Sequence, residues 1–167
     1  MRIYKLFLYS LLLLFVMIGC SNNQEDAGKH PESITFDNVA DLETTTIGNN
    51  SDVINAVSAL PAGTIPHTVE ISSKNLLIDY DLEKFNEDHK DEAAYWYDTK
   101  HQEKASRLNS AILFSLIPNL DKVEMTFKGE TDESYTVTRA ELSDTLDMNL
   151  DTWDKETFEK MKKGIAD

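Results

Sequence analysis

The chain has one cysteine among its 167 residues, Cys20, which ends an apolar run near the N-terminus. A single cysteine cannot form a disulfide within the chain, so the fold must be stabilised by a hydrophobic core. Removal of residues 1–19 leaves 148 of the 167 residues, and that length suffices for one domain with its own core. We therefore expect one small domain over residues 34–167.

The first residues predict an export signal over 1–19. Arg2 and Lys5 give a positive start, and a largely apolar segment of about a dozen residues follows over 6–18. This segment is shorter than the ~20 apolar residues that span a bilayer, and it matches a secretory signal peptide. Its end, Met17-Ile18-Gly19-Cys20, resembles the lipobox of bacterial lipoproteins, in which cleavage precedes a cysteine whose thiol carries a diacylglycerol.

The resemblance implies that Cys20 is the lipidation site. Two acyl chains give stable membrane anchoring where one is marginal. The alternative is an uncleaved single-pass anchor in which the cysteine has no role. Residues 20–33 are polar and have no periodic apolar pattern, which predicts a flexible tether behind the lipidated cysteine. The sequence thus places the domain at the cell membrane, lipid-anchored on the extracellular face.

The charge balance is strongly acidic, with 30 Asp and Glu against 16 Lys and Arg and a formal net charge of −14. Loss of Arg2 and Lys5 with the signal takes this to −16. Such a domain is repelled by nucleic acid and by anionic lipid, so we expect no nucleic-acid partner. The acidity indicates either a site for cations or basic peptides or simply a solvated, soluble surface.

Hydrophobic periodicity predicts an α+β fold, with antiparallel β-hairpins and helices packed on one face. Residues 82–106 are densely charged, and the pattern assigns this segment no role. The expected strands are 69–71, 76–80, 123–127 and 135–137, and the expected helices are 51–60, 91–117, 138–146 and 152–165. Residues 109–117 are either the buried half of the helix over 91–117 or a separate helix capped by Asn109.

Three segments carry a resemblance to a known family: TIGNNSDVINAVSALP, VEISSKNLLIDYDL and NSAILFSLIPNLDKVEMTF. Over roughly residues 46–142 the chain resembles the domain of unknown function numbered 4825, with its strongest marks at 48–51, Asn109, 113–117 and Asn119. That family occurs in lipoproteins of Gram-positive bacteria. It also forms an extracellular part of membrane metallopeptidases related to the β-lactam-sensing antirepressors. The resemblance implies an extracellular sensory or binding role and assigns no chemistry.

Tyr95, Trp96 and Tyr97 are consecutive, and a helix cannot bury three consecutive side chains on one face. We therefore expect at least one of the rings to be exposed. Exposed aromatic rings in a charged setting suit a partner-binding surface. The alternative is that Tyr97 and one neighbour pack against the sheet, while the third ring lies flat under charged side chains.

The segment from Asp147 to Phe158 begins like a calcium-binding loop, with oxygen ligands at its first, third and fifth positions, the last two being Asn149 and Asp151. Such a loop needs glycine at position six and glutamate at position twelve, where this chain has Thr152 and phenylalanine. The pattern therefore favours a turn between two helices, with Asp151 or Thr152 as the helix N-cap.

Other chemical groups form no recognisable motif. His89 and His101 are not at the helical spacing of zinc ligands, and we expect a solvated helix there. Asp79 and Asp81 share one strand face, and a carboxylate pair serves acid–base catalysis only when burial separates the two pKa values. The sequence contains no nucleophile or phosphate-binding motif. No catalytic residue, metal site or cofactor is predicted.

These patterns favour a lipid-anchored extracellular binding or sensory domain without catalytic activity, engaging a membrane or cell-envelope protein. A partner like those of the family relatives would make it a modulator of a sensory metallopeptidase system. The alternative is a small surface hydrolase with paired carboxylates, about 5 to 9.5 Å apart across a cleft for a glycosidase. A structural or solute-binding lipoprotein is a third interpretation, and the chain is small for a two-lobed solute-capturing fold.

Overall fold

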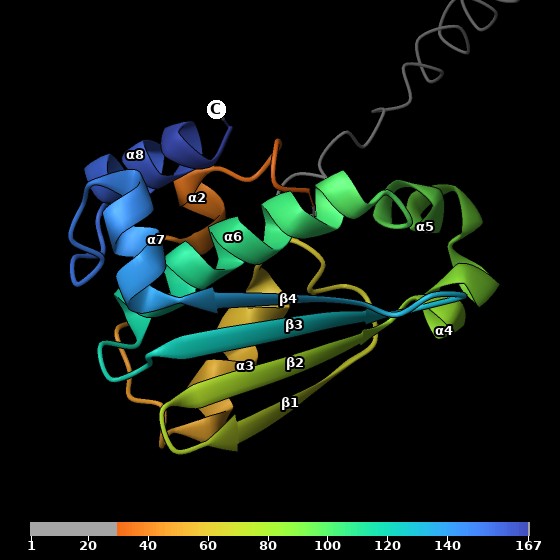
Figure 1. The fold of residues 1–167 in the computed structure, drawn as a ribbon, viewed down its shortest axis with the longest axis horizontal. Helices are drawn as coiled ribbons and strands as arrows, with labels where there is room; N and C mark the ends of the chain where they lie inside the picture. Colours follow the sequence, from red (N-terminus) through yellow and green to blue (C-terminus); the bar gives the residue numbers. More distant parts are fainter. Residues whose placement is uncertain (1–29, 167) are drawn as a thin grey trace, which may run out of the picture.

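The structure of the protein is a computed structural model that describes residues 30–166 (Figure 1). The predicted signal peptide over 1–19, the lipidation site Cys20 and the tether as far as residue 29 lie outside the described residues. Within 30–166, no helix is both long enough and apolar enough to cross a membrane.

The sheet has four strands in the order β1-β2-β3-β4. The strands are β1 (His67–Ser72), β2 (Asn75–Asp81), β3 (Lys122–Lys128) and β4 (Glu133–Thr138). Both predicted hairpins are present as antiparallel pairs, β1 with β2 and β3 with β4. The expectation of hairpins alone is incomplete, because β2 and β3 pair in parallel and join the hairpins into one mixed sheet.

The helices in the described residues pack around this sheet in the order α2 to α8. They are α2 (Phe36–Val39), α3 (Asn50–Ala59), α4 (Leu82–Asp88), α5 (Lys90–Trp96), α6 (Thr99–Leu116), α7 (Arg139–Leu146) and α8 (Lys155–Ala166). The α+β class and the single small domain are therefore confirmed.

The charged segment 82–106 has a topological role that the sequence pattern did not assign. Parallel neighbours cannot be joined by a tight turn and need a crossover connection of a dozen or more residues. Between β2 and β3 this connection consists of α4, α5 and α6. Leu82, Phe85, Ala93 and Trp96 attach the first two helices to the core, and the charged residues between them are exposed apart from the half-buried Glu92.

The segment expected to be helical over 91–117 forms two helices, and the break lies at Tyr97 and Asp98 rather than at Asn109. The Asp98 carboxylate accepts a hydrogen bond from the Lys100 backbone N–H at 2.9 Å and acts as the N-cap of α6. Aspartate satisfies the orphan N–H groups at a helix start, so a new helix begins there. Beyond the break, burial is continuous over 108–117, as predicted for the half after Asn109.

The core lies between one face of the sheet and the helices. Side chains on β2 and β3 alternate between buried and half-buried, so the two strands bury the same face. The buried set on this face is Leu76, Ile78, Tyr80, Val123, Met125 and Phe127. The Tyr80 and Phe127 rings stack at 4.9 Å between centroids, and Trp96 stacks on Phe127 from the crossover. Helices on one face of the sheet are thereby confirmed.

Segments outside the two hairpins complete the same core. Ile34, Phe158 and Met161 are each fully buried. Residues 30–33 are attached to the fold as well, because the His30 carbonyl accepts hydrogen bonds from the backbone of Ser33 and Ile34. Residues 30–33, which lie before the expected domain boundary at residue 34, therefore contact the folded domain.

One side chain closes the C-terminal end of α6. Arg139, the first residue of α7, donates to the carbonyl oxygens of Phe114, Ile117 and Leu120 at 2.7, 2.8 and 2.9 Å. Its guanidinium also pairs with the Asp151 carboxylate at 3.1 Å. The last carbonyls of a helix have no partner within the helix, and the planar fork of one arginine satisfies several of them at once.

Candidate functional site: a groove beside the edge strand

Strand β4 is an outer strand of the sheet and leaves one backbone edge open. It pairs only with β3. Within residues 30–166, no backbone hydrogen bond joins 133–137 to any other segment. Alternate N–H and C=O groups of an edge strand point away from the sheet, so β4 presents a row of free donors and acceptors.

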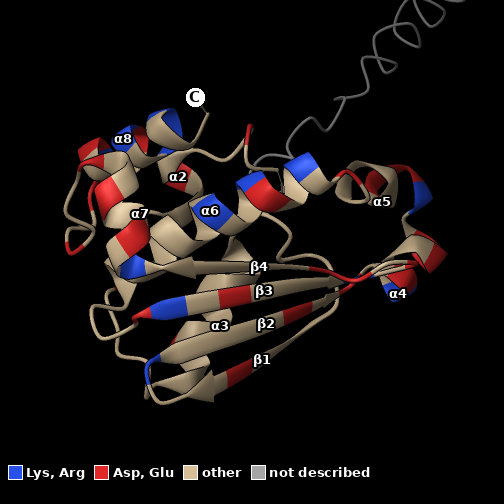
Figure 2. Cartoon of the chain, in the orientation of Figure 1, with Lys and Arg blue, Asp and Glu red and all other residues tan. Residues whose placement is uncertain are grey.

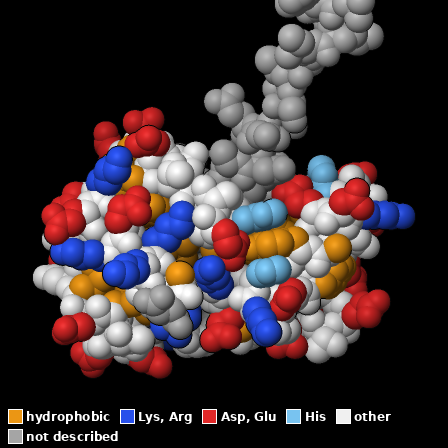
Figure 3. Space-filling model, turned by 90° about the horizontal axis from the view of Figure 1, so that it is seen from above, with side chains coloured by type: hydrophobic (Ala, Val, Ile, Leu, Met, Phe, Trp, Pro, Cys, Tyr) orange, Lys and Arg blue, Asp and Glu red, His pale blue; other side chains and the backbone are white. Residues whose placement is uncertain are grey.

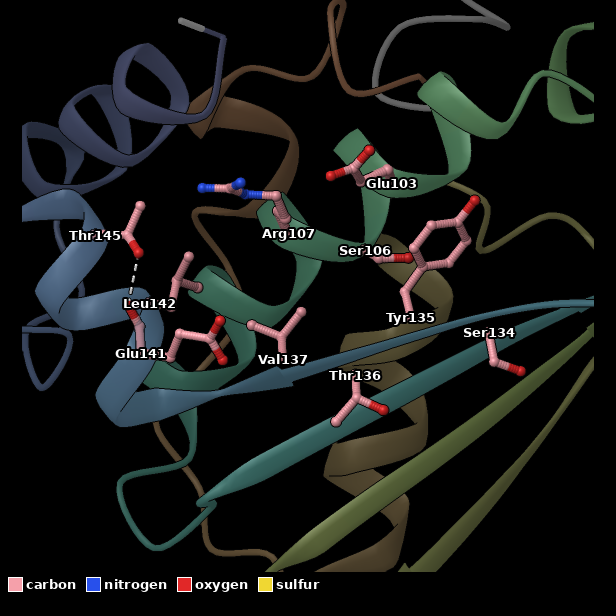
Figure 4. Close-up of a pocket in the computed structure, with 10 residues that line it drawn as sticks. All are labelled: Glu103, Ser106, Arg107, Ser134, Tyr135, Thr136, Val137, Glu141, Leu142 and Thr145. Atoms are coloured by element: carbon pink, nitrogen blue, oxygen red, sulfur yellow. Dashed lines mark hydrogen bonds between the residues drawn. The ribbon is translucent and has the colours of Figure 1, made fainter.

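A hollow of about 300 Å³ borders this edge, between α6, β4 and α7. It is lined by Glu103, Ser106, Arg107, Ser134, Tyr135, Thr136, Val137, Glu141, Leu142 and Thr145. In Figure 4 the Tyr135 and Val137 side chains rise from β4 toward α6, and the Ser106 hydroxyl points toward the Tyr135 ring. We call this hollow, together with the open edge of β4, the α6–β4 groove.

The tyrosine wall of the α6–β4 groove is held in place by its hydroxyl, whose one proton lies between two acceptor oxygens. The Tyr135 hydroxyl lies 3.1 Å from the Thr99 carbonyl oxygen and 3.2 Å from Gln102 Oε1. Gln102 is itself fixed, because its Nε2 donates to the Trp96 carbonyl at 2.7 Å. A side chain anchored in this way forms a preformed wall, which lowers the entropic cost of binding against it.

A second hollow, of about 440 Å³, continues along β4 toward the β3–β4 turn. Tyr97, Thr99 and Glu133 line it. Tyr97 is 41% exposed and is one of two large hydrophobic side chains that the described residues leave exposed. One member of the predicted aromatic surface therefore lies at the open end of the α6–β4 groove.

Two polar groups in the groove have no hydrogen-bond partner in the described structure. The Ser106 hydroxyl belongs to a residue with no exposed surface, and Arg107 Nε is buried although the residue is only half-buried. The hydroxyls of Ser110 and Ser115 also lack partners, but these residues do not line the hollow. A buried polar group without a partner costs free energy, and the burial of these atoms keeps them out of direct contact with a ligand in the hollow.

Acidic groups dominate the electrostatics of the groove. Its two hollows contain Glu103, Glu130, Glu133 and Glu141 against the single cation of Arg107. Burial raises the pKa of the Tyr135 phenol, and the nearby carboxylates of Glu133, Glu103 and Asp98 raise it further. Figure 2 shows acidic positions, with basic ones between them, along α4 and α5 close to this end of the sheet. The groove therefore attracts positive charge.

The structure separates the three consecutive aromatic rings. Trp96 is fully buried, so its ring packs in the core and is not part of the surface. Tyr95 is half-buried and Tyr97 is exposed. The expectation that at least one ring is exposed is confirmed. The predicted partner-binding set narrows to Tyr95 and Tyr97, because a helix that packs on a sheet directs one of three consecutive residues into the core.

Tyr95 joins the first described residues to α6. Its ring is stacked between His30 and His101, with both centroid distances at 3.8 Å and interplanar angles of 9° and 4°. The Tyr95 hydroxyl donates to Glu32, which also pairs with Lys104 at 3.1 Å. Figure 3 shows histidine side chains on both sides of a hydrophobic patch on this face. Tyr95 therefore has a structural role in positioning the N-terminal segment.

These contacts also change the ionisation of Glu32. Burial alone raises the pKa of its carboxyl, but the hydrogen bond from Tyr95 and the ammonium of Lys104 outweigh burial and lower it below 4.5. The pKa of the Tyr95 phenol is raised, first by burial and then by its bond to the Glu32 carboxylate.

The predicted carboxylate pair on β2 takes part in separate interactions. Asp79 pairs with Lys128 across the sheet at 2.7 Å. Asp81 accepts the Lys84 backbone N–H at 2.9 Å and is the N-cap of α4. These contacts favour structural roles for both residues.

The segment from Asp147 to Phe158 does not adopt a calcium-loop arrangement. Asp147 ends α7 in the left-handed region, with φ of 48°, and Asp151 pairs with Arg139. Phe158 lies in the core. The predicted helix–helix turn is present, but the N-cap is Asp154 rather than Asp151 or Thr152, because Asp154 Oδ1 accepts the Thr157 N–H at 2.8 Å, where α8 starts.

The two predicted histidines have different aromatic partners. His89 packs on Phe85 at 4.8 Å between ring centroids, and His101 stacks on Tyr95. Among residues 30–166, no group of three or more His, Cys, Asp or Glu side chains is arranged to hold a metal ion.

Sequence reasoning missed the α6–β4 groove. Ser106, Arg107 and Tyr135 belong to no motif, and they meet only because α6 lies beside β4 in the folded chain. The alternation that predicted β4 identified a strand but not its place at the edge. The nearest local signal was the run of small polar residues on the solvated face of β4, Ser134 and Thr136, which a paired central strand does not need.

The fold and the groove define a small α+β domain with a mixed four-stranded sheet and one open edge bordered by helices. The family model for a domain of unknown function (DUF4825) matches residues 40–138, more than half of the chain. The chain belongs to this family. No curated protein and no solved structure matches it.

The family's strongest sequence marks have structural roles in this chain. Asn109 Nδ2 donates to the Pro61 carbonyl at 2.8 Å, and Asn119 Oδ1 accepts the Ile47 N–H at 3.0 Å. Asn49 donates to Asp52 in the first turn of α3. These side chains tie the segment before β1 to the two ends of the buried part of α6, so they mark the fold rather than a reaction.

Proposed function

We propose that this protein is a lipid-anchored extracellular binding domain, attached to the membrane through Cys20, that engages a membrane or cell-envelope protein. The observation that carries the proposal is the α6–β4 groove, because it combines an open strand edge with a hollow that has an anchored tyrosine as its wall. Concave sites of this kind, with a few convergent polar groups, are the usual places where proteins bind ligands.

The position of the groove supports an attachment close to the membrane. Nine residues lie between Cys20 and His30, and the ten residue steps of an extended chain between them reach about 35 Å. His30 is stacked on Tyr95, and the adjacent Glu32 pairs with Lys104 of α6. Glu103, the neighbour of Lys104, lines the groove. A lipid on Cys20 therefore keeps the groove within reach of proteins embedded in the same membrane.

Site-specific photo-cross-linking in intact cells tests the proposal. A photoreactive amino acid replaces Thr136, which is exposed on β4, or Thr68, which is exposed on the opposite edge strand β1. We expect position 136 to yield a reproducible adduct with one membrane or envelope protein, and position 68 to yield none. We also expect Cys20→Ala to leave the membrane fraction and to lose the adduct.

Equal adducts from both positions, or no adduct from position 136, would count against the groove as the binding surface. Retention of Cys20→Ala in the membrane fraction would count against lipid anchoring and favour an uncleaved apolar anchor.

A further inference from the structure

The free edge of β4 can extend the sheet by one strand. A new strand lies 4.7–4.9 Å from its neighbour and needs only backbone groups to pair. Ser134 and Thr136 are exposed on β4, so no large side chain covers this edge on the solvated face. Extended peptides commonly bind proteins in this way, with affinity from backbone hydrogen bonds and selectivity from pockets that receive alternate side chains.

The hollow beside β4 provides such a pocket. Its floor and walls combine the anchored Tyr135 ring with Val137 and Leu142, which are apolar, and with the unpartnered Ser106 hydroxyl. The second hollow, with Tyr97, lies further along the same strand. Every second side chain of a bound strand points to the same face, so two hollows along β4 can receive two of its side chains.

The opposite edge of the sheet is less suited to this role. β1 is also an outer strand, but none of the five hollows described on the molecule is lined by a residue of β1. An added strand there would gain backbone hydrogen bonds without access to the hollows that border β4. The hollows beside β4 therefore make this edge more selective than β1 for the side chains of a bound strand.

Charge specifies the side chain that the pockets favour. Glu103 and Glu141 flank the first hollow and Glu133 lines the second, with Arg107 as the only opposing charge. The chain as a whole carries a formal charge of −14. A lysine or arginine on the bound segment would gain from both the local carboxylates and the overall field, whereas an acidic segment would be repelled.

We infer that the α6–β4 groove binds an extended peptide segment that carries a lysine or arginine, and that the segment adds a fifth strand to the sheet along β4. This inference rests on the proposed binding function and specifies the class of partner. Peptide carbonyl groups are the acceptors for the free N–H groups of β4.

A selection from a displayed library of random dodecapeptides against the whole chain tests the inference. We expect the recovered peptides to be enriched in lysine and arginine. Synthetic copies should lose at least about tenfold in affinity when alternate backbone amides on one edge are N-methylated, because those amides donate to β4. N-methylation of the amides on the other edge should change affinity by less than about twofold.

Amide hydrogen exchange locates the added strand. Peptide binding should protect backbone amides of β4 and leave those of β1 unchanged. The double substitution Glu103→Gln and Glu133→Gln should weaken a lysine-bearing peptide by about fivefold to tenfold, and Glu70→Gln on β1, which removes an exposed carboxylate from the opposite edge, should leave it unchanged.

Several results would overturn the inference: recovery of no peptide, recovery without enrichment in basic residues, or binding that tolerates N-methylation on both edges. Photo-cross-linking at position 136 separates this failure from a failure of the proposed function. An adduct in cells without peptide binding leaves the binding domain in place and rejects strand addition. Absence of both rejects the two proposals together.

Discussion

The C-terminal end of α6 and the outer edge of β4 pose the same physical problem, and the molecule treats them differently. Each is a row of backbone groups that secondary structure leaves without partners. At the helix end, Arg139 crosses from α7 and satisfies the carbonyls of Phe114, Ile117 and Leu120. At the strand edge, no backbone group of 133–137 has a partner outside β3 in the described residues.

The backbone groups at the end of α6 are hydrogen-bonded by a side chain, whereas those at the outer edge of β4 remain free. Arg139 supplies hydrogen-bond donors to the carbonyl groups at the end of α6, where the β3–β4 hairpin and α7 also meet. The β4 edge has equally close neighbours in α6 and α7, yet their side chains line a hollow instead of bonding to the strand. An open row beside a hollow is the arrangement that a binding partner can use.

Substitution of Arg139 should have the largest effect on the free energy of unfolding, because it removes the donor to the carbonyl groups at the end of α6. Arg139→Leu leaves the carbonyls of Phe114 and Leu120 without a donor, whereas Ile117 keeps the Leu120 N–H, and we expect the free energy of unfolding to fall by about 3–5 kcal/mol. Chemical denaturation measures this change. Arg107→Leu is the matched control on α6. Its buried Nε has no partner, and the cost should stay below about 1 kcal/mol. Similar losses in both variants would show that Arg139 acts by packing alone.

Gly63→Ala tests a second closely packed part of the backbone, the loop between α3 and β1. A Cβ atom at Gly63 would lie 2.3 Å from the Ser58 carbonyl oxygen, so the backbone must shift. We expect a loss of about 2–4 kcal/mol in the free energy of unfolding. Gly48→Ala is the control, since a Cβ there meets nothing within 4 Å, and thermal unfolding should place it within a few degrees of the wild type.

Asn109→Ala should cost less, about 1–3 kcal/mol, because it removes one hydrogen bond and leaves the Pro61 carbonyl without its donor. Ser110→Ala is the neighbouring control. Its hydroxyl is buried without a partner, so its removal should be neutral or slightly stabilising. Equal destabilisation in both denaturation curves would contradict the role assigned to the asparagine.

Tyr95→Phe tests the attachment of the first described residues through its pH dependence. The pKa of Glu32 is lowered in the fold, so its contribution to stability is present above about pH 4.5 and is lost as pH falls through the folded value. We expect the variant to be less stable by about 0.5–1 kcal/mol at pH 7. Parallel denaturation curves at pH 7 and pH 3 should show this difference shrinking at acid pH. A constant difference would mean that the Tyr95 hydroxyl does not bond the ionised carboxylate.

Substitutions in the open groove should have the smallest effect on folding. Glu103→Gln and Glu133→Gln remove exposed or half-exposed carboxylates, and each should change the free energy of unfolding by less than about 0.5 kcal/mol. A larger loss in either variant would show that the groove is part of the structural framework. Stability that remains intact while peptide affinity falls would sharpen the contrast between the closed helix end and the open strand edge.

Local patterns in the sequence were sufficient for most secondary structure. Alternation at 76–80 and 123–127 predicted β2 and β3, because side chains of a strand point to opposite faces in turn. Ser72 to Asn75 formed the expected turn, with Ser73 at φ of 59°. Thr138 was placed at the start of α7 by its capping pattern, and its hydroxyl accepts the Glu141 N–H. Each of these features depends on residues within a few positions of one another.

Features that depend on distant residues were not predictable in the same way. Alternation describes β2 and β3 equally well in either pairing direction, so the parallel register, in which Ile78 lies opposite Met125, left no mark in either strand. The burial of Trp96 also depends on a distant partner, the Phe127 ring on β3.

The sequence by itself determined the α+β class, the two hairpins, the buried half of α6 and the family to which the chain belongs, because these follow from short-range periodicity, capping and turn chemistry. Only the tertiary structure decided that the hairpins join through a parallel pair, that the charged segment 82–106 is their crossover, that Arg139 closes α6 and that β4 is left with an open edge. The physical reason is that strand order and side-chain capping arise from contacts between segments far apart in the chain, and a local pattern does not record which segment its partner will be.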